Sequence, residues 1–168
     1  GNTREEMKED ESEEETLLYI IKQTMVVVKT ADTQKSYSIG YLINLLLGRG
    51  LLEKYAGREP INEEEEDYDT LNLDKQDIIF TLANYGIFVV RNSGIVRVAN
   101  SNINLSRALQ DYPKYSKNPT NVLKRLEGVV KPVNPRYLGH KGSNSRCIEI
   151  PSKHFYISNK EGDNGSNT

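Results

Sequence analysis

Side chains that can contact a phosphate backbone or the edges of bases are concentrated between residues 107 and 146. Lys and Arg pair with phosphate oxygens, whereas Asn, Thr and His hydrogen bond to phosphates, sugars or base edges. The candidate nucleic-acid contacts are Arg107, Lys114, Lys117, Thr120, Asn121, Lys124, Arg125, Arg136, His140, Lys141, Asn144 and Arg146. Positions 120 and 121 precede positions 124 and 125 by one helical turn, so these four side chains are expected to share one outward surface.

The charge of the chain is distributed unevenly, although the net charge is only −2. Residues 101–160 contain eleven Lys or Arg against three acids, which gives a net charge of +8. Residues 1–16 contain eight acids against two bases, which gives a net charge of −6. A strongly basic third of a chain favours an acidic partner, which is either nucleic acid or an acidic protein.

Few side chains suit catalysis or metal binding. Cys147 is the only cysteine, which excludes an internal disulfide. The only histidines are His140 and His154, and with one cysteine these are too few ligands for most metal sites. Cys147 lies in an expected strand, which predicts a buried and inert thiol. The Gly48–Gly50 stretch lacks the Lys-Ser or Lys-Thr pair of a phosphate-binding loop. We therefore expect a protein that is not an enzyme and that needs no cofactor or metal.

The first helices of the fold that positions the candidate nucleic-acid contacts are expected between residues 16 and 56. Apolar residues at helical spacing predict a helix that starts near Thr16 as its N-cap, and the β-branched run 25–28 leaves a strand open as an alternative. A second helix is expected over residues 37–47, ended by the glycines that follow. Together these helices form an expected helical extension over residues 16–56.

Three polar segments are expected outside the packed core. Residues 1–15 form an expected disordered acidic tail, residues 57–73 an acidic linker and residues 158–168 a second disordered tail, because none can bury enough apolar surface to offset its ordering entropy. The acidic run in the linker is alternatively a loop that binds a partner or shields the basic surface. The opening Gly1–Asn2 is typical of a cleavage scar, which suggests a fragment of a longer protein.

Residues 74–157 are expected to form the main domain. A helix is predicted to open at Asp74, and two apolar runs around Asn92-Ser93-Gly94 predict a β-hairpin over residues 87–99. A short helix over about 102–110 and a second helix over 119–127 follow, the latter with Asn118 as N-cap and proline at its first position. Two extended runs near 133–138 and 146–150 are joined by a polar, glycine-containing loop.

The stretches 104–109, 119–126 and 147–150 give this region a resemblance to the winged-helix branch of the helix-turn-helix DNA-binding proteins. The resemblance implies an α+β fold, here with an N-terminal helical extension, in which the second helix of the pair enters the major groove. It also implies that the loop between the last two extended runs is a wing that contacts DNA. The same region resembles the winged-helix appendage at the end of some phage and plasmid primase-helicases.

The leading hypothesis is an accessory module of a replication or recombination protein that binds duplex DNA. One alternative is a protein-interaction adaptor on a winged-helix scaffold, since fold alone does not define function. The other is a single-strand binder in which Tyr112, Tyr115 or Tyr137 stacks on bases. The sequence shows no secretory signal and no apolar run long enough to span a membrane, and with a single cysteine this predicts an intracellular location, in the nucleus, cytoplasm or nucleoid, without membrane attachment.

Overall fold

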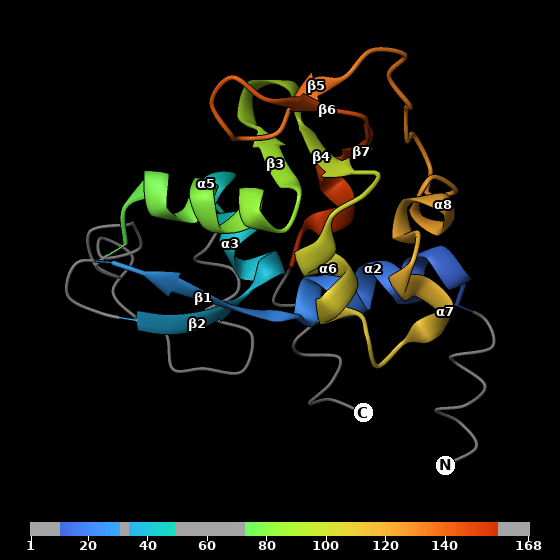
Figure 1. Cartoon of the computed structure of the whole chain (residues 1–168), viewed down its shortest axis with the longest axis horizontal. Coiled ribbons are helices and arrows are strands. Elements are labelled where there is room, and N and C mark those ends of the chain that lie inside the picture. The colour runs from blue at the N-terminus through green and yellow to red at the C-terminus, as the bar shows by residue number, and fades with distance from the viewer. Residues whose placement is uncertain (1–10, 31–33, 50–72, 158–168) are drawn as a thin grey trace.

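A computed structural model describes residues 11–30, 34–49 and 73–157, and these residues form a mixed α+β structure (Figure 1). The predicted α+β class is therefore confirmed. Most of the expected acidic linker and most of both expected tails lie outside the described residues.

The first helix, α2 (Glu13–Gln23), begins three residues before the expected start at Thr16. Ser12 is the N-cap instead, because its hydroxyl accepts a hydrogen bond from the Glu15 backbone N–H and donates one to the Glu15 carboxylate. Three glutamates occupy the first turn, where negative charge interacts favourably with the helix dipole. The end of the expected acidic tail is thus part of a capped helix.

The β-branched run after α2 forms a strand, so the expected helix does not continue through residues 25–28 and the strand, the stated alternative, is confirmed. Strand β1 (Met25–Lys29) pairs in antiparallel register with β2 (Gln34–Ser38). Val26 and Val28 are buried and their neighbours are exposed, which is the two-residue alternation of a strand with one covered face. Helix α3 (Ile39–Leu46) follows, two residues later than expected because Tyr37 and Ser38 still pair in β2.

A three-stranded antiparallel sheet forms the framework of the second half. Helix α5 (Lys75–Asn84) is capped by Asp74 and leads into the expected hairpin of β3 (Ile87–Val90) and β4 (Ile95–Ala99). The 3-10 turn η2 joins the two strands over the expected Asn-Ser-Gly segment. Strand β7 (Cys147–Pro151) adds to the other side of β4, which gives the order β3-β4-β7.

Three short helices lie between β4 and β7. They are α6 (Ile103–Ala108), α7 (Pro113–Ser116) and α8 (Pro119–Leu123). Helix α8 ends about four residues before the expected end, and Lys124 is its C-cap. A short hairpin of β5 (Arg136–Tyr137) and β6 (Asn144–Ser145) follows, and after β7 the 3-10 turn η3 (Ser152–Phe155) completes the fold.

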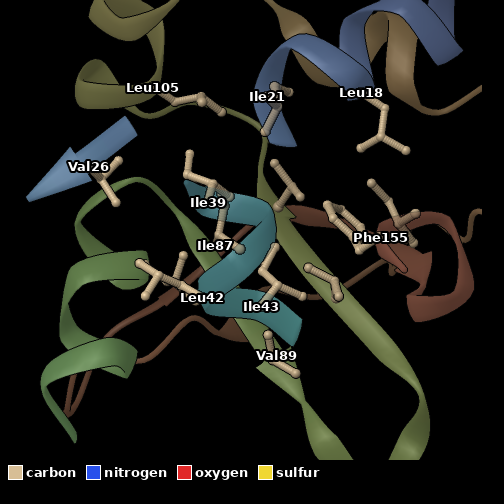
Figure 2. Packing of buried hydrophobic residues seen from close by; sticks show 14 of the residues in the cluster. Leu18, Ile21, Val26, Ile39, Leu42, Ile43, Ile87, Val89, Leu105 and Phe155 are labelled. Atoms are coloured by element: carbon tan, nitrogen blue, oxygen red, sulfur yellow. The ribbon is translucent and has the colours of Figure 1, made fainter. Parts of the chain in front are cut away.

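The expected helical extension and the expected main domain share one hydrophobic core. Figure 2 shows Ile39, Leu42 and Ile43 of α3 among buried side chains from α2, β1, β3, α6 and η3. Polar contacts join the same parts, since the buried Asn44 side chain donates a hydrogen bond to the Phe155 carbonyl at 2.8 Å. The surface that carries the candidate contacts is therefore supported from both halves of the chain.

Candidate nucleic-acid interface

A polar hollow of about 200 Å³ opens between α8, the end of β4 and strand β7. We call it the asparagine hollow, and it is lined by Asn100, Asn118, Thr120, Asn121, Lys124, Lys131 and Ile148. Its lining contains three side-chain amides and two ammonium groups, and it contains no carboxylate. Such a lining offers several hydrogen-bond donors to an anionic ligand and no repelling charge.

Local hydrogen bonds fix the α8 side of the hollow. Asn118 precedes α8, and its side-chain oxygen accepts a hydrogen bond from the Thr120 hydroxyl at 3.2 Å. The Asn121 backbone N–H donates to the Asn118 carbonyl, and the Lys124 backbone N–H donates to the Thr120 carbonyl. Thr120 itself is only 4% exposed, so its side chain supports the wall of the hollow. The expectation that Thr120 faces outward toward a base edge is therefore wrong.

The opposite side of the hollow connects to the base of the expected wing. The Asn100 backbone N–H donates to the Arg146 carbonyl at 3.0 Å, and the Arg146 guanidinium donates to the Val133 carbonyl at 3.1 Å. Both Arg146 and Lys131 are exposed beside this junction. The backbone of Arg146 is thus joined to Asn100 of the hollow, while its guanidinium lies against Val133.

Sequence reasoning missed Asn100, Asn118 and Lys131 as candidate contacts. The sequence predicts only a helix cap at Asn118, and it predicts no helix or strand around Lys131. In the structure this segment is held against β7 because the backbones of Val130 and Glu149 exchange two hydrogen bonds. The one sequence feature that points to Lys131 as a contact is its position in the basic region 101–160, whose net charge is +8.

Lys124 and Arg125 do not share one surface, which corrects the expected grouping of four side chains. Lys124 lines the asparagine hollow, whereas the Arg125 guanidinium contacts the Glu13 carboxylate of α2 at 2.8 Å. The two residues are consecutive, and consecutive side chains of a helical turn point in different directions, so Lys124 and Arg125 diverge. Helix α2 packs against α8 and brings its first turn to Arg125.

Lys114 belongs to the same acid–base cluster as Arg125. Its ammonium lies 2.5 Å from the second oxygen of the Glu13 carboxylate, so one glutamate bridges two expected phosphate contacts. Hydrogen bonds from Lys114 and Arg125 lower the pKa of Glu13, and the Glu13 hydrogen bond raises the pKa of Lys114. Both cations are thus paired within the protein.

The loop of the expected wing folds back onto α5 and β3. His140 Nε2 lies 3.1 Å from the Ala83 carbonyl oxygen, and the Tyr137 ring packs edge-on against Phe88. Gly139 is buried, and a Cβ at this position would lie 2.9 Å from Ala83 Cβ. Close approach at this glycine therefore serves packing of the loop against α5.

The remaining candidates lie on separate parts of the surface. Arg107 of α6 lines a different hollow together with Met25 and Asp111, and Lys117 is exposed between α7 and α8. Exposed positions on the β5–β6 hairpin and its loop include Lys141 and Asn144, and Arg136 is half-buried there. The structure therefore brings Asn121 and Lys124 together in one hollow, with the backbone of Arg146 bonded to Asn100 of its lining, and it places the other exposed candidates elsewhere.

The three candidate stacking tyrosines do not form one platform. Tyr115 is buried, whereas Tyr112 and Tyr137 are exposed. Tyr112 precedes α7 and Tyr137 lies in β5, and Figure 1 shows β5 at the top of the molecule and α7 at the right, well below it. A continuous stacking surface would need neighbouring aromatic faces, so this arrangement does not favour single-strand binding by all three.

The chain matches no protein-family model, no curated protein and no solved structure in the comparisons made. Within residues 11–30, 34–49 and 73–157, no three or more His, Cys, Asp or Glu side chains are grouped to hold a metal ion. None of the helices in these same ranges is long and apolar enough to cross a membrane.

Proposed function

We propose that the protein is a non-catalytic nucleic-acid-binding module that binds duplex DNA through the asparagine hollow. The observation that carries this proposal is a hollow lined by three amides and two lysines, with no carboxylate in its lining. Arg146 adds a further exposed cation at its edge. The surrounding +8 region supplies the long-range attraction that a polyanion requires.

The two kinds of side chain in the hollow have different tasks. Lys124 and Lys131 neutralise backbone phosphates, a contact that positions the protein without reading sequence. Asn121 follows the start of α8 and is exposed, so its amide is available to a base edge or a sugar–phosphate group. Binding of this kind is strongly salt-dependent, because each phosphate contact releases counterions.

The order of elements supports a winged-helix arrangement as part of this proposal. Helices α6, α7 and α8 are followed by the β5–β6 hairpin and by β7, which returns to the sheet. In this arrangement α8 is the helix that faces the groove, with Asn121 and Lys124 as its contacts. The β5–β6 hairpin contributes Arg146 from its base and not from its packed-back loop.

The test is a salt series of binding to a labelled duplex and to a labelled single strand of the same sequence. The Lys124→Ala/Lys131→Ala variant is expected to bind the duplex more weakly and to lower the salt slope by about 1 for each lysine. Lys29→Ala/Lys35→Ala is the matched control, because it removes the same charge from the β1–β2 hairpin, far from α8 in Figure 1. Equal behaviour of the two variants, or no binding at about 50 mM salt, overturns the proposal.

A protein-interaction adaptor is the second candidate, and exposed apolar side chains favour it. Val130 and Val133 are 57% and 81% exposed, and they flank Lys131 at the edge of the hollow. A basic surface with apolar neighbours fits an acidic peptide that also carries apolar side chains. Absence of nucleic-acid binding at low salt, together with binding of such a peptide that Lys131→Ala weakens, would establish this function instead.

A further inference from the structure

Glu13 is positioned as an internal ligand of two cations. One carboxylate oxygen lies 2.5 Å from Lys114 Nζ, and the other lies 2.8 Å from Arg125 Nη2. The cations come from α7 and from the residues after α8, and the carboxylate comes from the first turn of α2. The three side chains therefore meet only in the folded protein.

The carboxylate is held in place by the packing of its helix. Leu17, Leu18 and Ile21 bury one face of α2 in the core, and α2 packs against α8. Ser12 caps the helix directly before Glu13. The Glu13 carboxylate therefore has a high effective concentration at the two cations, because it does not lose the translational entropy that a free anion loses on binding.

A carboxylate that bridges two cations through separate oxygens imitates a backbone phosphate, which also presents two anionic oxygens. The side chains of Lys114 and Arg125 are 69% and 50% exposed, so a phosphate can reach both. Exposed ion pairs contribute little stability and are screened by salt, which makes the Glu13 carboxylate displaceable.

We propose that Lys114 and Arg125 form a second backbone-phosphate site, which Glu13 occupies in the free protein and a nucleic-acid phosphate takes over on binding. This inference rests on the proposed function. Lys124 and Arg125 are consecutive, so the asparagine hollow and the second site lie on either side of the end of α8. Glu13 thereby lowers affinity for every polyanion, and only a ligand that also contacts the hollow offsets this loss.

The approach to the second site is restricted. A hollow of about 310 Å³ next to Arg125 is lined by several acids, among them Glu14, Glu15 and Glu127. A phosphate would be repelled there, so the site is open to a ligand from the Lys114 side. Access from this one side favours binding of a duplex, because its rigid backbone can place a phosphate at the second site while it contacts the asparagine hollow.

The test compares duplex binding by Glu13→Gln with binding by Glu11→Gln. Both variants lose one negative charge, and Glu11 makes no ion pair within the described residues. Glu13→Gln is expected to bind at about 50 mM salt with an affinity on the order of fivefold higher, and to steepen the salt slope by about 2. Glu11→Gln is expected to stay near the wild type on both measures. Thermal melting of both variants verifies that α2 remains folded.

A second pair of variants assigns the gain to the two cations. Lys114→Ala/Arg125→Ala is expected to abolish the gain in the Glu13→Gln background. In the wild-type background the same variant is expected to weaken binding less, because there a phosphate must first displace Glu13 to reach the two cations. If Lys124→Ala/Lys131→Ala weakens binding while Glu13→Gln leaves affinity and slope unchanged, the second site is wrong and the proposed function stands. If no variant binds nucleic acid at low salt, both are wrong.

Discussion

Arg97 and Glu149 lie opposite each other on β4 and β7, with Arg97 Nε 2.8 Å from Glu149 Oε2. The Arg97 guanidinium also donates a hydrogen bond to the Tyr137 carbonyl at 3.1 Å. The backbone of Glu149 in turn pairs with Val130, beside the asparagine hollow. One ion pair thus connects the sheet, the β5–β6 hairpin and the segment that carries Lys131.

Arg97→Ala is expected to lower the free energy of unfolding by about 1–3 kcal/mol, because Glu149 is only 14% exposed and would lose its partner. Urea denaturation at neutral pH measures this change. The Arg97→Met/Glu149→Met double variant is expected to recover most of the loss, since no unpaired charge remains. A double variant less stable than the single one would show that the pair itself contributes the stability.

Packing of the wing loop on α5 can be measured by two glycine substitutions. Gly139 has φ +95 and a Cβ there would lie 2.9 Å from Ala83 Cβ, whereas Gly142 has φ +72 with nothing within 4 Å. Gly142→Ala is therefore expected to cost about 1 kcal/mol from backbone strain alone, and Gly139→Ala about 2–4 kcal/mol. Equal losses in urea denaturation would mean that the loop is not packed on α5 in solution.

Cys147 makes stability fall at alkaline pH. Burial raises the pKa of its thiol, and the nearby Glu149 charge raises it further. In the unfolded chain the thiol ionises near pH 8.5, while the folded protein keeps it protonated, so stability is lost as the pH rises beyond that value. The urea midpoint of the wild type is expected to fall more steeply between about pH 8 and about pH 10 than that of Cys147→Ala. Parallel curves would contradict this.

Asn44 is a buried polar link between the two halves of the chain. Its amide donates to the Gly40 carbonyl at 2.7 Å and to the Phe155 carbonyl at 2.8 Å. Asn44→Ala is expected to cost about 2–3 kcal/mol, because the substitution leaves a buried carbonyl without its partner. Asn104→Ala, which removes an exposed amide bonded to the Asn84 carbonyl, is the matched control and is expected to cost under about 1 kcal/mol. Similar losses in thermal melts of the two variants would contradict the role assigned to Asn44.

Elements with strong local signals could be predicted from the sequence. The hairpin around Asn92-Ser93-Gly94, the helix capped by Asp74 and the helix start at Asn118 all form as expected. Helix α8 begins with proline at its first turn and has no capping hydrogen bond from the Asn118 side chain to the backbone. At Asp74 the deciding interaction lies within a few residues, because its carboxylate accepts a hydrogen bond from the Gln76 backbone N–H. Such interactions are visible in the sequence because their partners are neighbours.

The arrangement of the candidate site depends on partners that are distant in the chain and was therefore not predictable. Arg125 turns toward Glu13, which is 112 residues away, and no local pattern indicates this pair. Consecutive side chains of a helical turn diverge, and the pair with Glu13 directs Arg125 away from the hollow that Lys124 lines. His140 likewise contacts Ala83 through a fold of the loop that glycine content alone does not specify.

The distant pairing has a consequence for how the chain folds. Lys22 donates to the His154 carbonyl across 132 residues, and Asn44 reaches Phe155 across 111 residues. Contacts of such high sequence separation require closure of long loops before they contribute energy, which slows folding. During synthesis α2 and α3 emerge well before α8 and η3, so the parts of their surfaces that pack on these two late elements stay uncovered until late in translation. This interval is when the chain is most exposed to aggregation and to chaperone binding.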